Sequence, residues 1–170
     1  MGKKQAQKDL PALETLRQLC NDFNGSVCSV WRKGYGYTGT LHFGRMHPVE
    51  NPHPGSVDAD QGAIMLNFWS CDRVLSNPLG ASVVDSRLHK EEESLMAFHA
   101  LEGKRVSTVE LDETELSLRL VFTDGHSVVL LVDSSQKGKN DEQWAVESGS
   151  GPSAGVFGLD WVRSTVADDS

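Results

Sequence analysis

Three glycines are the first residues of the chain whose spacing could serve chemistry. Gly34, Gly36 and Gly39 form the pattern G-x-G-x-x-G, which in nucleotide-binding proteins leads from a strand into a helix whose N-terminus holds a phosphate. Here the following residues, TGTLHFG, alternate as in a strand, and Pro48 comes soon after them. Because a phosphate site of this kind needs the missing helix, we interpret the glycines as turn and bulge residues of a β-hairpin.

Three histidines and a glutamate are the next residues that could act together, here as metal ligands. His42, His47, Glu50 and His53 supply the imidazole and carboxylate groups that zinc binds. The intervening sequence PVENPHPG is interrupted by prolines, so these groups cannot share one face of a helix. We therefore expect no metal site, and a small metal-dependent enzyme using these four residues is kept as an alternative function.

The cysteines are the remaining candidates for nucleophilic chemistry. Cys71 precedes Asp72 and Arg73, and the arginine could tune its thiol, but the sequence shows no base beside it. Cys20, Cys28 and Cys71 lack metal-type spacing, so we expect three small buried hydrophobic side chains in a reducing cytoplasm. No G-x-S-x-G pattern is present. The sequence thus predicts no catalytic residue, no metal ligand and no cofactor.

The elements that would position these residues follow from hydrophobic periodicity. Residues 9–25 repeat apolar side chains every three or four positions and predict a helix that ends at Asn24 and Gly25. Residues 26–31 and 37–44 alternate and predict the two strands of a hairpin.

The rest of the chain predicts mostly strands. Residues 63–71 form an apolar run, which indicates a strand buried on both faces. Residues 90–101 predict a second, short helix, and residues 116–133 predict a hairpin that turns at Asp124 and Gly125. Further strands are expected over 105–111 and 142–148, a flexible segment over 149–155, and a strand or short helix over 156–164.

The predicted fold class is α+β. About seven or eight strands, mostly antiparallel because their connections are short, accompany the N-terminal helix and the second short helix. We expect a single domain over residues 1–165, followed by a flexible acidic tail over 166–170.

Charge is unevenly divided along the 170 residues. Residues 1–85 hold eight basic and eight acidic side chains, whereas residues 86–170 hold eight basic and sixteen acidic ones, which accounts for the net charge of −8. An acidic surface repels nucleic acid and attracts a basic protein. No run of 18 apolar residues and no apolar leader is present, so we expect a cytoplasmic protein that binds no membrane.

Two surfaces are candidates for contact with a partner. Tyr35 and Tyr37 stand at the predicted hairpin tip beside Arg32, where they either form contact residues or fold back over the sheet. The second candidate is the acidic run that follows residue 109, whose simplest interpretation is a solvated face. The candidate partner-binding residues are Arg32, Tyr35, Tyr37, Glu110, Asp112, Glu113 and Glu115.

Residues 27–147 resemble a diffuse group of small bacterial α+β proteins. The shared features are a hairpin that carries tryptophan and glycines, a central strand ending near C-x-R, an L-x-G-x-x-V strand, and an L-x-L-x-F-x-D-G hairpin followed by a tryptophan strand. Some members of the group look like immunity proteins or accessory components of bacterial toxin and defence loci. The resemblance implies protein binding and supplies no catalytic residue.

We therefore expect a non-enzymatic protein of a bacterial conflict system. It would act as an immunity-like inhibitor, or antitoxin, that occludes a basic partner protein. The alternative is a structural or accessory subunit of a larger bacterial defence or regulatory complex, in which hairpin edges add to another sheet.

Overall fold

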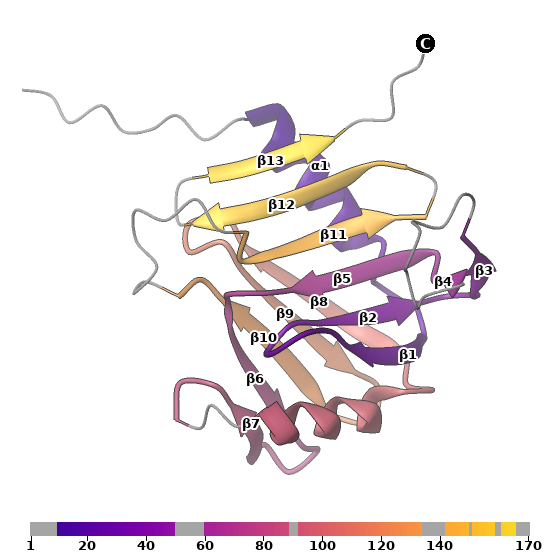
Figure 1. The fold of residues 1–170 in the computed structure, drawn as a ribbon, viewed down its shortest axis with the longest axis vertical. Coiled ribbons are helices and arrows are strands. Elements are labelled where there is room, and N and C mark those ends of the chain that lie inside the picture. Colours follow the sequence, from indigo (N-terminus) through magenta and orange to yellow (C-terminus); the bar gives the residue numbers. More distant parts are fainter. Residues whose placement is uncertain are drawn as a thin grey trace, which may run out of the picture.

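In the described residues, the two large antiparallel sheets share one hydrophobic core between their inner faces (Figure 1). The computed structural model describes residues 10–49, 60–88, 92–133, 142–149, 151–158 and 161–165. The predicted α+β class is confirmed, with helix α1 (Leu10–Asn21) and a second helical segment, η1 (Glu92–Leu101). The tail 166–170 lies outside the described residues.

Within the described residues, the first sheet has the order β1-β2-β5-β11-β12-β13. Its central strand β5 is buried at every position, as the apolar run predicted. The bounds are β1 (Cys28–Lys33), β2 (Gly39–Phe43), β5 (Ile64–Phe68), β11 (Trp144–Ser148), β12 (Ser153–Gly158) and β13 (Trp161–Thr165).

The second sheet has the order β7-β6-β10-β9-β8 in the described part of the chain. The predicted hairpin is β9 and β10, and Gly125 takes a positive φ of 97° in its turn. The bounds are β6 (Asp72–Ser76), β7 (Ser82–Asp85), β8 (Val106–Asp112), β9 (Ser117–Phe122) and β10 (Ser127–Leu131), and a small separate pair is β3 (His47–Pro48) with β4 (Asp60–Gln61).

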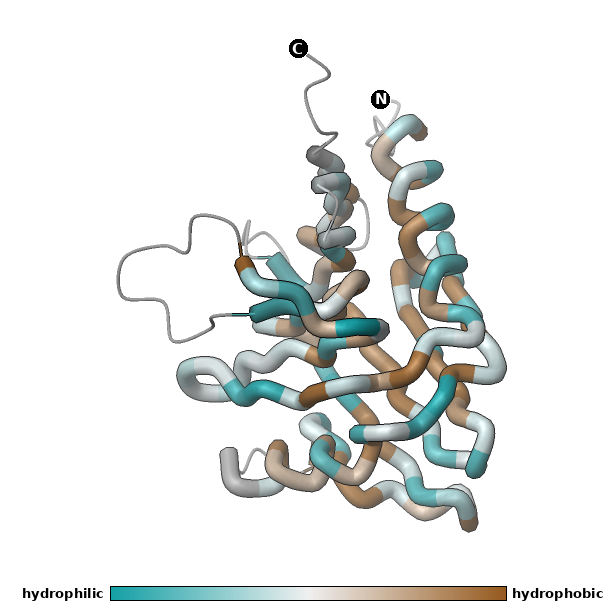
Figure 2. The backbone as a smooth tube through the Cα atoms, turned by 90° about the vertical axis from the view of Figure 1, so that its right-hand side faces the viewer, coloured by the Kyte–Doolittle hydropathy of each residue, from teal (hydrophilic) through white to brown (hydrophobic). Residues whose placement is uncertain are grey.

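The two helical segments close the core. Figure 2 shows hydrophobic positions alternating along the strands and recurring along α1, and the buried side of α1 includes Leu13, Leu16 and Leu19. This helix packs mainly against β12 and β13. The second predicted helix is present as η1, but its turns are of the tighter 3₁₀ type. It packs against β1 and β7.

An aromatic stack joins η1 to the first sheet. The ring of Trp31 lies 5.2 Å from that of Phe68 and 4.8 Å from that of Phe98, both in stacked geometry. The third glycine of the G-x-G-x-x-G pattern serves this stack, because a Cβ on Gly39 would lie 2.0 Å from the Trp31 ring. The hairpin interpretation of the glycines is confirmed, and Gly36 adopts a positive φ of 63° in the β1–β2 turn.

Substituting Gly39 with alanine is expected to lower the free energy of unfolding by about 1–3 kcal/mol, because the added methyl group must displace the Trp31 ring. Urea unfolding measures this change. The matched control is Gly36→Asn, since asparagine tolerates positive φ and the space beside Gly36 is open. If the Gly39 variant and the parent protein are equally stable, the Trp31 ring moves aside without lowering the free energy of unfolding, and the prediction is contradicted.

The three cysteines are buried and carry free thiols, as expected. Burial raises the pKa of all three, for Cys28 and Cys71 to about 12. The positive charge of Arg73 lowers the pKa of the Cys71 thiol, but burial outweighs it. The thiols are therefore protonated at neutral pH and act as apolar side chains.

Asp124 makes the β9–β10 turn sensitive to acid. Its partial burial opposes ionisation, but hydrogen bonds from Lys104 and from the amide and ring of His126 outweigh this and lower the Asp124 pKa to about 2. The Asp124 Oδ2 lies 2.6 Å from the Lys104 Nζ and 2.8 Å from the His126 Nδ1.

Stability contributed by Asp124 is expected to be lost as the pH falls from about 4 towards 2. The folded pKa lies below the ordinary 3.8, so the contribution is fully present above the ordinary value and disappears as the pH drops through the lowered one. Urea unfolding between pH 2 and pH 6 should show a smaller pH dependence for Asp124→Asn than for the parent chain. Identical pH dependence of the two proteins would contradict this role.

Candidate functional site

The β1–β2 turn presents two tyrosines to solvent. Tyr35 is 97% exposed and Tyr37 41% exposed. The turn is held internally, because the Gly34 amide donates to the Thr38 carbonyl oxygen at 2.9 Å and the Thr38 hydroxyl donates to the Tyr35 carbonyl oxygen at 2.8 Å. Tyr35 therefore projects from an ordered turn and does not fold back over the sheet.

A buried arginine anchors this turn to the second sheet. Arg73 of β6 is 3% exposed, and its Nη1 donates to the Tyr37 carbonyl oxygen. Its Nη2 donates to the carbonyl oxygens of Trp69 at 2.8 Å and Cys71 at 3.2 Å, and its Cζ lies 5.1 Å from the Phe68 ring centre. Burial lowers the Arg73 pKa. The guanidinium thus fixes the position of the turn relative to β6.

A pocket of about 240 Å³ opens beside the turn, and we call it the Trp69 pocket. A second hollow of about 570 Å³, which includes Arg32 and Lys33, also borders Trp69, so this half-buried indole takes part in both. Trp69 belongs to the apolar run 63–71 that predicted a strand buried on both faces, but its side chain is half-buried. The residues that line the Trp69 pocket are Tyr37, Trp69, Ser70, Cys71, Asp72, Arg73, Ser86 and Asp133.

Arg32, which was expected at the partner surface, is tied to a neighbouring segment. Its Nη1 donates to the Asp60 carbonyl oxygen at 2.7 Å and its Nη2 forms an ion pair with the Asp60 carboxylate. Arg32 therefore joins β1 to β4 and supports the turn from one side.

The predicted acidic surface is formed by β8 and the turn after it, and most of its carboxylates are used within the chain. Glu110 pairs with Arg119 at 3.3 Å. Asp112 accepts hydrogen bonds from the amides of the next turn. Glu113 accepts two bonds from Arg17 of α1, at 3.2 and 2.6 Å.

Glu115 completes the acidic run as an exposed residue. The turn over residues 112–115, here the acidic turn, is bonded to α1 through Arg17. The β1–β2 turn that carries Tyr35 and Tyr37, here the tyrosine turn, is bonded to β6 through Arg73. The two predicted surfaces are thus anchored to different elements, and they are separate candidates.

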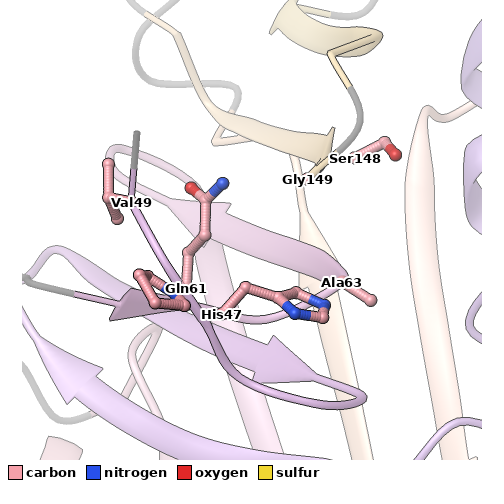
Figure 3. Close-up of a pocket in the computed structure, with 7 residues that line it drawn as sticks. His47, Val49, Gln61, Ala63, Ser148 and Gly149 are labelled. Carbon is pink, nitrogen blue, oxygen red and sulfur yellow. The ribbon is translucent and has the colours of Figure 1, made fainter. Parts of the chain in front are cut away.

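A hollow of about 740 Å³ lies where β3 and β4 approach the end of β11. Figure 3 shows the His47 ring and the Gln61 amide on one side and Ser148 on the other. His42 is elsewhere, since it is 3% exposed and its Nδ1 accepts the Gly62 amide at 3.0 Å.

His42 therefore lies buried on β2, whereas His47 lies exposed on β3 of the β3–β4 pair. Glu50 and His53 lie outside the described residues. Among those described, no three histidine, cysteine, aspartate or glutamate side chains form a group that could hold a metal ion.

Comparisons with protein-family models, curated proteins and solved structures give no match to this chain. In the described segments, no helix has the length and apolar character needed to cross a bilayer. The features that bear on function are the tyrosine turn, the two hollows that Trp69 lines and the charges around them.

Proposed function

We propose that this protein binds a partner protein without catalysing a reaction, as an immunity-like inhibitor that covers the partner's working surface. The exposed Tyr35 on an internally bonded turn carries this proposal. Tyrosine is enriched among the residues that dominate binding energy at protein interfaces. A turn held in place before binding also loses little conformational freedom when the complex forms.

Exposed apolar side chains near β7 support the same proposal. Leu79 and Leu88 flank β7 and are 92% and 74% exposed, and Val83 within the strand and Met96 on η1 are each 51% exposed. Figure 1 shows β7 and η1 side by side at the lower end of the molecule. Several large apolar side chains on adjoining elements are typical of a surface that another protein covers.

The net charge of −8 favours a basic partner. Opposite charge on the two proteins speeds their encounter and disfavours acidic competitors. Because Glu110 and Glu113 already pair with arginines of this chain, we assign the main contact to the tyrosine turn and give the acidic turn a steering role.

Replacing Tyr35 with alanine is expected to weaken partner binding about tenfold or more, because the variant removes an exposed aromatic anchor without touching the core. The partner to test first is the purified product of the neighbouring gene, with affinity measured by calorimetry. The matched control is Thr108→Ala, an exposed position on β8 of the other sheet. Failure to bind any protein at micromolar concentration, or equal affinity of the Tyr35 variant, would overturn the proposal.

A second candidate function is a subunit of a larger assembly. Strand β8 is the last strand of the second sheet in the described residues. Residues 25–27 bond to its start at 105–106, and its positions 107, 108, 110 and 112 are exposed. An edge of this kind can accept a strand from another protein. Size measurement on proteins co-expressed from the same operon distinguishes a multi-subunit assembly from a one-to-one complex.

A further inference from the structure

The Trp69 pocket has the size of a receptor for one side chain. Its volume of about 240 Å³ lies below the roughly 300–1,000 Å³ of pockets that hold drug-sized molecules. It opens beside the exposed tyrosine turn, so a protein that covers Tyr35 would place its own side chains within reach of the opening. A single long side chain is therefore the natural occupant.

The charges of the pocket lining favour a cation. Asp72 and Asp133 contribute two carboxylates, against one guanidinium from Arg73. The Arg73 guanidinium is directed at backbone, because its Nη atoms donate to three carbonyl oxygens and it lies over the Phe68 ring. The Asp72 Oδ1 accepts a hydroxyl bond from Ser86 at 3.1 Å, and the Asp72 charge also acts on Arg73 and on Arg87, whose guanidinium is paired with Asp85. The net formal charge of the lining is thus negative.

Two aromatic side chains complete the lining. Tyr37 comes from the β1–β2 turn and Trp69 follows β5. Aromatic faces attract ammonium and guanidinium groups, and tryptophan and tyrosine do so more strongly than phenylalanine. Carboxylates combined with aromatic rings bind a long basic side chain through both its charge and its apolar stem.

We propose that the Trp69 pocket receives one long cationic side chain, arginine or lysine, from the partner protein. The identity of the occupant as part of a protein rests on the proposed function, whereas its cationic chemistry rests on the pocket alone. Arginine suits the site best, since its planar guanidinium both stacks on an indole and bonds to a carboxylate.

Titration of the full, ¹⁵N-labelled chain with capped tripeptides tests the chemistry directly. The probes are Gly-Arg-Gly, Gly-Lys-Gly, Gly-norleucine-Gly and Gly-Glu-Gly, and the readout is the NMR shift of the Trp69 indole N–H and of the Ser70 and Asp72 amides. We expect the arginine and lysine peptides to shift these signals in a saturable way, with no saturable shift from the other two. A norleucine response equal to that of arginine, a stronger glutamate response, or no response to any peptide would overturn the proposal.

Matched variants test the lining of the pocket. Asp72→Asn and Tyr37→Ala should each weaken binding of the arginine peptide about fivefold, whereas the control Thr108→Ala, at an exposed position of β8, should leave it unchanged. Two pocket variants are used because Asp72 also bonds Ser86, and thermal unfolding confirms that each is folded. Unchanged affinity in both folded variants would overturn the assignment. If the arginine peptide binds but no partner protein is found, only the proposed function is refuted. If a partner protein binds but the arginine peptide does not, only the role of the pocket is refuted.

Discussion

Replacing Trp144 with alanine is expected to lower the free energy of unfolding by about 3–5 kcal/mol. Trp144 is fully buried on β11 in the middle of the first sheet. Its indole Nε1–H donates to the Leu116 carbonyl oxygen at 3.0 Å, which joins this sheet to the β8–β9 turn of the other. The variant therefore leaves a large cavity and removes a hydrogen bond between the sheets.

The hydrogen bond to Leu116 has a special importance because that residue adopts a positive φ of 51° while fully buried. A side chain other than glycine is disfavoured there by roughly 1–2 kcal/mol, so neighbouring contacts must hold it.

Trp144→Phe isolates this contact, and we expect a loss of about 1–3 kcal/mol from the carbonyl left without its donor. Urea unfolding of both Trp144 variants, with half-buried Trp69→Phe as control, measures the two contributions. If the Trp144 variants lose no more free energy of unfolding than the Trp69→Phe control, the Trp144–Leu116 hydrogen bond does not stabilise the contact between the sheets.

Replacing Arg73 with methionine is expected to lower the free energy of unfolding by about 2–4 kcal/mol. Methionine fills similar space but leaves the carbonyl oxygen of Cys71, which is buried, and those of Tyr37 and Trp69, which are partly buried, without their donor. A buried group left in this way costs about 1–3 kcal/mol. Removing the guanidinium also removes the cost of burying its charge, which is why the expected loss is smaller than the sum.

The control for Arg73 is Arg32→Met, which loses an ion pair to the exposed side chain of Asp60 and is expected to cost about 1 kcal/mol or less. Urea unfolding compares the two variants, and amide exchange at residues 35–38 reports whether the tyrosine turn loosens. If the Arg73→Met variant is as stable as the parent, the cost of burying the guanidinium charge equals the stability that its hydrogen bonds contribute, and the expected loss is contradicted.

Elements with a strong local pattern could be predicted from the sequence. The apolar repeat of α1, the alternation of β9 and β10 around Asp124 and Gly125, and the buried run of β5 all correspond to what the structure shows. Each depends on neighbouring residues in the chain, so a short window holds the necessary information.

Elements whose residues carry no strong local pattern could not be predicted. Residues 149–155 were expected to be flexible because they are rich in glycine and serine, yet β12 begins at Ser153 and pairs with β11 and β13. Gly155 lies there under the Glu142 carboxylate, only 2.7 Å from where a Cβ would be. The expected strand number was also low, since a strand as short as β7 shows too few residues for an alternating pattern and is defined by its pairing with β6.

The candidate site shows the same division. Exposure of Tyr35 follows from its place at a hairpin tip, which the local pattern indicated. The pocket beside it is formed where β6 approaches the turn, and nothing in the sequence around Trp69 distinguishes it from a core tryptophan. Glu113 pairs with Arg17, which lies 96 positions away in the chain. The sequence around the acidic run therefore gave no sign that this carboxylate is bonded within the protein.

The packing of α1 against β11, β12 and β13 has a consequence for biosynthesis. The ribosome makes the helix long before these strands. The apolar side of α1 therefore lacks most of its packing partners while more than a hundred further residues are synthesised. Contacts of such long sequence separation form slowly, and uncovered apolar surface invites aggregation or chaperone capture in the meantime. Burial of that side of α1 is therefore a late step in folding, completed only after β11, β12 and β13 have been made.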